Sequence, residues 1–241
     1  MTQLDPLSSE DIAARLSGSP EARAALIREG AEAGLAEAQA VYGQMLLDAQ
    51  KPAEAFGWFW KAAQQGHPMG LNMLGRCYDL GWGTRIDKGR AAACFRVAAE
   101  AGLDWGMYNY GSALALGAGL TQDKAAALGW FQKASAMGHA KSTNFVGSFH
   151  EEGDLLPRDM AAAADCYARA AEGGDFRGMF NHARMLAEAG DVDGALQWIG
   201  RCGAEARPVF RDKALAWLAQ VPDMRLRTEG SALLRKGSDA C

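Results

Sequence analysis

The sequence lacks long hydrophobic runs, although 49% of its 241 residues are hydrophobic. No stretch approaches the roughly 18 consecutive apolar residues that a membrane-spanning helix needs, so no membrane partner is expected. The opening stretch MTQLDPLSSEDIAARL has early Asp5 and Pro6 residues and none of the apolar character of a secretory signal. We therefore expect a soluble, cytoplasmic protein.

The chain also lacks a large excess of positive or negative charge. The chain has 25 Lys and Arg against 29 Asp and Glu, a net charge of -4, which gives no general attraction to nucleic acid or to an anionic membrane. Only the segment 207–241 is basic, with seven Lys and Arg against four Asp and Glu. A solvated surface explains such a segment most simply, and weak anion binding there is kept as an alternative to the main hypothesis.

Cysteine is sparse and irregularly spaced. The five cysteines form no C-x-x-C pair, and their odd number fits a reducing compartment better than a disulfide framework. The segment HEEGD at 150–154 lacks the second histidine of a zinc-binding HExxH helix, and no S-x-x-K motif is present. The sequence therefore predicts no catalytic residues, no metal and no cofactor, so the protein is not expected to be an enzyme.

Glycine, by contrast, is abundant, with 29 residues, and it recurs with a period of 36. The columns in this period are Gly66, Gly102, Gly138 and Gly174; Gly75, Gly111 and Gly147; Gly81, Gly117 and Gly153; and Asp87, Asp123 and Asp159. Internal repeats of this length are typical of α-solenoids, in which each unit buries its apolar face against its neighbours.

The period predicts five units of two helices each. Their boundaries are 35–66, 67–102, 103–138, 139–174 and 175–206. In the second unit, Pro68 suits a first helical turn, Gly81 a C-terminal cap and Asp87 the cap of the next helix. Gly75 in the middle of a helix indicates a close approach of helices, with small alanines of the second helix as its expected counterpart.

The two ends of the chain are predicted to close the stack. Residues 1–34 are expected to form capping helices, with Ser19 as N-cap and Pro20 in the first turn. Residues 207–221 are expected to form a C-terminal capping helix. Beyond Pro222 the apolar pattern fades into glycine and mixed charge, so 222–241 is predicted to be a loosely ordered tail.

The segment GHPMGLNMLGRCYDLGWGTRIDKGRAAACFRVAAEAG resembles a Sel-one-like repeat, a relative of the tetratricopeptide repeat. The residues that carry the resemblance are Leu74, Gly75, Tyr78, Gly81, Gly83, Asp87, Ala91, Phe95, Ala98, Ala99 and Gly102. It extends over about residues 31–206, and Leu155 departs from it by replacing the second loop glycine. The resemblance implies an all-α, tetratricopeptide-like superhelix that acts as an adaptor. The composition and the repeat type also hint at a bacterial source.

In such a superhelix the first helix of each repeat lines the concave surface. The predicted partner-binding residues are Met69, Met73, Arg76, Trp105, Asn109, Lys141, Phe145, Arg177, Asn181 and Arg184. Tryptophan and arginine dominate the energetics of many interfaces. Trp105 and Phe145 are predicted as aromatic anchors, the asparagines as partners of an extended backbone, and the arginines as partners of carboxylates. The alternative is that the two aromatic residues pack between adjacent units.

The predicted function is therefore a non-enzymatic adaptor that binds a protein or peptide segment in the concave groove. The resemblance also implies an alternative, β-lactam binding or hydrolysis, as in cysteine-rich relatives. The sequence does not identify the partner, and it slightly favours a monomer. His67 and His139 are equivalent residues two repeats apart, and they are predicted to cap helices rather than to bind a ligand.

Overall fold

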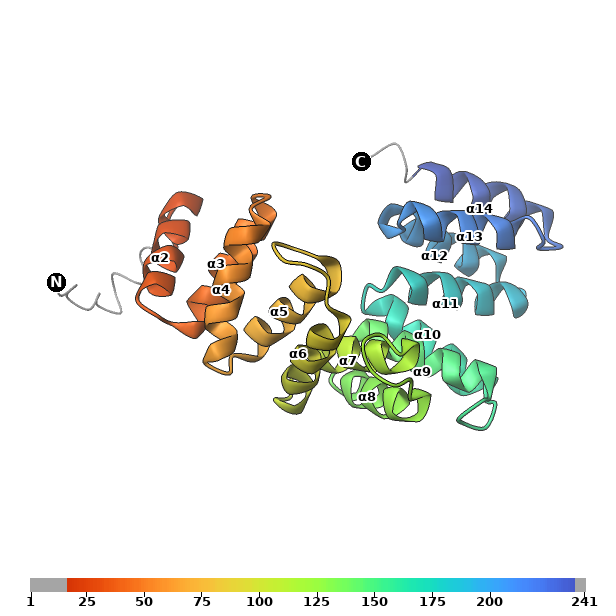
Figure 1. Cartoon of the computed structure of the whole chain (residues 1–241). Coiled ribbons are helices and arrows are strands. Elements are labelled where there is room, and N and C mark those ends of the chain that lie inside the picture. Colours follow the sequence, from red (N-terminus) through yellow and green to blue (C-terminus); the bar gives the residue numbers. More distant parts are fainter. Residues whose placement is uncertain (1–16, 237–241) are drawn as a thin grey trace, which may run out of the picture. The chain divides into compact units, whose positions relative to one another are not determined.

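The computed structural model describes residues 17–236, which contain thirteen helices and no strand (Figure 1). The first helices of the repeats are α3 (Ala36–Asp48), α5 (Pro68–Leu80), α7 (Asp104–Leu116), α9 (Ala140–Glu152) and α11 (Phe176–Glu188). The second helices are α4 (Pro52–Gln64), α6 (Lys88–Glu100), α8 (Lys124–Ala136), α10 (Met160–Glu172) and α12 (Val192–Glu205). Flanking these are α2 (Pro20–Glu32), α13 (Pro208–Leu218) and α14 (Met224–Lys236). The predicted all-α helical repeat fold is confirmed.

The chain forms two compact units that divide between Asp123 and Lys124, in the middle of the third repeat. In unit 1, the first helices α3, α5 and α7 contact one another in succession, and α4 and α6 pack between them. In unit 2, α9 contacts α11, and α10 packs against both, while α12 packs against α11 and α14. Each unit therefore has its own set of first helices: α3, α5 and α7 in unit 1, and α9 and α11 in unit 2.

Helix caps fix the ends of the repeat helices as predicted. Nδ1 of His67 accepts a hydrogen bond from the backbone N–H of Gly70 (3.1 Å), and His139 caps α9 in the same way. Oδ1 of Asp87 accepts from the N–H of Arg90 (2.9 Å) at the start of α6. Gly81 ends α5 in the left-handed conformation, with φ of 77°, which glycine adopts without strain.

Glycines set how closely the helices approach. A Cβ added at Gly75 would lie 2.6 Å from Cε1 of Phe95, so the predicted close approach is confirmed but its counterpart is an aromatic ring. The alanine column lies against a different glycine: a Cβ at Gly70 would lie 2.6 Å from Cβ of Ala62. This contact explains why glycine is present at position 70, because a Cβ there would collide with Ala62.

The prediction of a loosely ordered tail is wrong for residues 224–236, which form α14. Oδ1 of Asp223 caps this helix by accepting from the N–H of Leu226 (2.7 Å). Leu226 and Leu234 are fully buried in the core of unit 2, with Gly230 between them on the same face. The high charge of the segment hid this i, i+4, i+8 stripe.

Two expectations fall partly on residues outside the described range, namely 1–16 of the predicted N-terminal helices and 237–241 of the predicted tail. Within residues 17–236, none of the helices combines the length and the apolar character needed to cross a membrane.

Candidate functional site

The first helices of unit 1 expose apolar side chains at equivalent positions. Met69 lies in the first turn of α5 and Trp105 in the first turn of α7, with 36% and 39% of their surfaces exposed. The ring of Trp105 packs edge-to-face against Tyr108, with centroids 6.2 Å apart. We call the surface formed by α5 and α7 the first-helix face of unit 1.

Paired asparagines join the first helices in both units. Nδ2 of Asn109 donates to Oδ1 of Asn72 at 2.8 Å, between α7 and α5. Nδ2 of Asn181 donates to Oδ1 of Asn144 at 2.9 Å, between α11 and α9. Asn72 and Asn144 are buried, and the sequence prediction missed both. The signal was present, because the Asn72/Asn144 and Asn109/Asn181 columns each repeat at twice the 36-residue period.

A cavity of about 140 Å³ with a mixed polar and apolar lining lies beside the asparagine pair of unit 1. It is formed by α5, α6 and α7, and its polar lining consists of Arg76, Asp79, Lys88, Asn109 and Ser112. Nζ of Lys88 donates to Oδ1 of Asp79 (2.7 Å). The guanidinium of Arg76 lies 4.6 Å from the ring centroid of Trp82. The structure thus brings the predicted residues Arg76 and Asn109 together at one cavity.

The corresponding part of unit 2 is filled by an ion pair. Nη2 of Arg184 donates to Oε2 of Glu151 at 2.6 Å, and the hydroxyl of Tyr167 donates to the same oxygen at 2.6 Å. Burial raises the pKa of Glu151, but the hydrogen bonds from Arg184 and Tyr167 outweigh it and bring the pKa below its usual value. Arg184 was predicted to bind a partner's carboxylate; that prediction is wrong, because its carboxylate is Glu151 of the same chain.

Two further predictions need correction. Met73 is only 5% exposed and belongs to the core of unit 1, because positions three and four residues after Gly70 lie on the same helix face. The half-buried Phe145 stacks on Phe131 with centroids 4.7 Å apart and planes at 7°. The structure therefore favours the alternative, in which Phe145 packs between helices.

The remaining predicted residues lie near the surface of unit 2. Lys141 is half-buried in the first turn of α9. Arg177 is exposed at the start of α11, and its guanidinium lies 4.8 Å from the ring centroid of Phe176. Arg177 is therefore an exposed cation whose guanidinium packs on the ring of Phe176.

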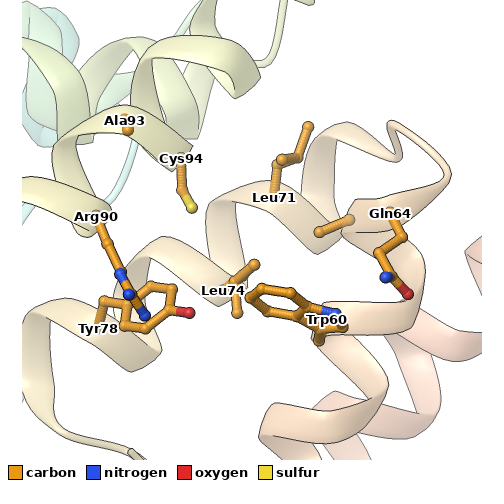
Figure 2. Close-up of a pocket in the computed structure, with 9 residues that line it drawn as sticks. Trp60, Gln64, Leu71, Leu74, Tyr78, Arg90, Ala93 and Cys94 are labelled. Carbon is orange, nitrogen blue, oxygen red and sulfur yellow. The ribbon is translucent and has the colours of Figure 1, made fainter. Parts of the chain in front are cut away.

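A larger cavity, of about 400 Å³, lies on the other side of α5, between α4 and α6 (Figure 2). We call it the second-helix groove. Its lining is Trp60, Ala63, Gln64, Leu71, Leu74, Tyr78, Arg90, Ala93 and Cys94. Trp60 is 42% exposed, and the guanidinium of Arg90 lies 5.6 Å from the ring centroid of Tyr78. None of these residues was predicted as a site residue.

The chemistry of the cysteines disfavours a nucleophilic role. Burial raises the pKa of Cys77 and of Cys202 to about 12 and that of Cys94 to about 11. Thiols with such a pKa stay protonated at neutral pH, whereas the thiolate is the nucleophile. In the part of the chain that the structure describes, no group of three or more His, Cys, Asp or Glu residues is placed to hold a metal ion.

The basic C-terminal segment uses several of its cations internally. Nη2 of Arg211 donates to the carbonyl oxygen of Ala206 (3.1 Å), and Nη2 of Arg227 donates to that of Val221 (3.0 Å). Arg225 pairs with Asp193 (2.7 Å). The contacts of Arg211 and Arg227 with carbonyl oxygens use hydrogen-bond donors within the chain, and Arg225 is neutralised by an acidic partner.

Comparison with known families and structures places the repeats. The Sel1 repeat model matches residues 36–67, 68–103, 106–139 and 140–175. A solved protein of uropathogenic Escherichia coli, the protective antigen c5321, is 26% identical with a TM-score of 0.69, covering 95% of this chain and 52% of that one. A Sel1 repeat protein from Oxalobacter formigenes is 26% identical with a TM-score of 0.68, covering 84% of this chain and 60% of that one.

Among curated proteins, the DAP3-binding cell death enhancer 1 of Rattus norvegicus is 37% identical over 76 residues, which are 30% of this chain and 14% of the rat protein. The chain thus spans a small part of this relative and little more than half of the two structures. Sel1 repeat proteins generally mediate protein–protein interactions and are generally non-catalytic. Because the four matched ranges cover more than half of the chain, this protein belongs to the Sel1 repeat family.

Proposed function

We propose that the protein is a non-enzymatic adaptor that binds a segment of a partner protein on the first-helix face of unit 1. One observation carries this proposal: the exposed Met69 and Trp105 lie on the same two helices as the polar side chains Arg76 and Asn109, which line a cavity. Apolar anchors next to polar groups are the usual composition of a protein-binding hot spot.

Each part of the face has a distinct role in this proposal. Trp105 supplies a large, rigid apolar contact, and the flexible Met69 adapts to the shape of the partner. Asn109 uses one N–H on Asn72, while an asparagine amide has a second N–H and a carbonyl oxygen. Those groups suit the backbone of an extended segment, and Arg76 at the cavity suits an acidic side chain of that segment.

Site-specific photo-crosslinking tests the proposal in the native host. A photoreactive amino acid at position 69 on α5 should crosslink a discrete partner, whereas the same group at position 97 on α6 should not; Val97 is 40% exposed and thus equally accessible. The position-69 crosslink should fall about tenfold or more with Trp105→Ala, as expected for a hot-spot tryptophan.

Val97→Ala is the control variant, because Val97 is as exposed as Trp105 but lies on α6, outside the first-helix face. It should leave the position-69 crosslink unchanged. Equal crosslinking from positions 69 and 97, or a crosslink that survives Trp105→Ala in a folded protein, would place the partner elsewhere and refute the proposed face.

A further inference from the structure

The second-helix groove lies at a column of side chains that alternates between tryptophan and cysteine. The column consists of Trp58, Cys94, Trp130, Cys166 and Trp198. In the first and last repeats the tryptophan packs on a ring of the first helix: Tyr42 and Trp58 lie 5.3 Å apart at 71°, and His182 and Trp198 lie 5.3 Å apart at 73°. In the second repeat, the equivalent residues are the smaller Leu74 and Cys94.

The cavity beside Leu74 and Cys94 has a volume of about 400 Å³, within the range of about 300–1,000 Å³ found for ligand pockets. Trp60 adds a further wall, and its column holds Arg96, Gln132 and Ala168 in the next repeats. Figure 2 shows the indole of Trp60 and the sulfur of Cys94 on opposite sides of Leu74. The groove is thus a recess with room for a side chain and with one aromatic wall, formed by Trp60.

The polar groups of the groove lie at its rim. Arg90 is the one charged residue among the nine that line it. Its side chain is 68% exposed and lies 3.4 Å from Oδ2 of Asp87, through Nε, which leaves the terminal guanidinium nitrogens toward solvent or a ligand. Gln64, on α4, adds an amide that can pair with a peptide backbone.

We propose that the second-helix groove binds a protein segment that inserts one aromatic side chain between Trp60 and Cys94, with an acidic residue next to it facing Arg90. The occupant follows from the lining: Cys94 stands where three other repeats hold tryptophan, the walls are apolar, and Arg90 at the rim carries a positive charge. This is a second binding surface, on different side chains of unit 1 from those of the first-helix face.

A peptide titration tests this inference directly. The probe is a short blocked peptide with one ¹⁵N-labelled tryptophan followed by two glutamates, observed by NMR during titration with the full chain. We expect saturable broadening of its indole signal. A peptide with alanine in place of tryptophan should bind at least about tenfold more weakly, and one with lysines in place of the glutamates about threefold more weakly.

Cys94→Trp is the decisive variant, because it fills the recess with the side chain that the same column holds at positions 58, 130 and 198. It should weaken peptide binding at least about tenfold, whereas Cys94→Ser should not. If Cys94→Trp fails to fold, the exposed Trp60→Ala and Arg90→Glu keep the test open, with expected losses of about tenfold and threefold.

Trp105→Ala should leave peptide binding unchanged, so this result is independent of the outcome for the first-helix face. Three results would overturn the inference: no binding of the tryptophan peptide, undiminished binding to a folded Cys94→Trp, or binding of free N-acetyltryptophanamide as tight as that of the peptide. The last result would identify a site for small aromatic molecules instead of a protein segment.

Discussion

The two units have equivalent residues on equivalent first helices, yet these residues form a cavity in unit 1 and an ion pair in unit 2. We call the two surfaces the open face and the closed face. In both, an asparagine pair joins neighbouring helices. Beyond that pair, unit 2 has Glu151 and Arg184 in an ion pair, whereas the equivalent residues of unit 1 are Asp79 and Ser112, which line a cavity of about 140 Å³.

Side-chain length at two columns accounts for this difference. Arg184 reaches Glu151 across the helix pair, while Ser112 is too short to bridge to Asp79, which pairs with Lys88 instead. A satisfied buried network rigidifies its surroundings, whereas a binding surface needs polar groups with unused capacity. The same repeat can therefore serve as support in unit 2 and as a binding surface in unit 1.

The largest expected effect comes from removing the ion pair of the closed face, between Arg184 and Glu151. Arg184→Ala leaves the carboxylate of Glu151 with Tyr167 as its hydrogen-bond donor and removes its positive partner. We expect the free energy of unfolding to fall by about 2–3 kcal/mol, measured by urea denaturation. Hydrogen exchange should accelerate in α9 and α11 and stay unchanged in α5 and α7.

Arg169→Ala is the control for Arg184→Ala, because its ion pair with Asp165 lies on the exposed surface of α10. It should lower the free energy of unfolding by about 0.5 kcal/mol or less. Equal effects of the two variants would show that the Glu151 network does not stabilise unit 2.

The next effect tests what the two units share. Asn109→Ala and Asn181→Ala each leave a buried asparagine, Asn72 or Asn144, without its inter-helix donor. Each change should lower the free energy of unfolding by about 1.5 kcal/mol. A large difference between the two values, again measured by urea denaturation, would mean that the paired helices are not equivalent in the two units.

A smaller effect isolates the hydroxyl of Tyr167. The same column holds Phe95 and Phe131, so Tyr167→Phe keeps the shape and removes only the hydrogen bond to Glu151. The expected loss is about 1 kcal/mol in the free energy of unfolding. In a Glu151→Gln background the loss should shrink, and an unchanged loss in that double-mutant cycle would argue against coupling between the two side chains.

The smallest effect is the pH dependence of the closed face. The pKa of Glu151 is lower in the folded protein than its usual value of 4.5, so the stability that its ionised form contributes is present above pH 4.5 and is lost as the pH falls through the folded pKa. Wild type should therefore lose stability more steeply than Glu151→Gln below pH 4.5. Parallel stability curves for the two proteins in that range would contradict this expectation.

Much of the fold was readable from the sequence because the repeat period fixes which residues are equivalent. The caps at His67, Asp87 and Gly81 follow from local chemistry and agree with the structure. The candidate surface was less predictable. Equivalent positions in the repeats show which residues share a helix face, but they do not show which of these residues are already in contact with side chains from other helices. Met73 and Arg184 were assigned to the surface for that reason, and contacts from other helices decided otherwise.

The second glycine of the long repeat loops has a consequence for how such proteins can be lengthened. At Gly83 an added Cβ would collide with the carbonyl oxygen of Pro52, at the start of α4, and at Gly119 with the backbone of Lys88, at the start of α6. Each of these loops therefore docks on the preceding repeat. A repeat with such a loop is not a free module in a recombined chain, because the loop must match the unit before it.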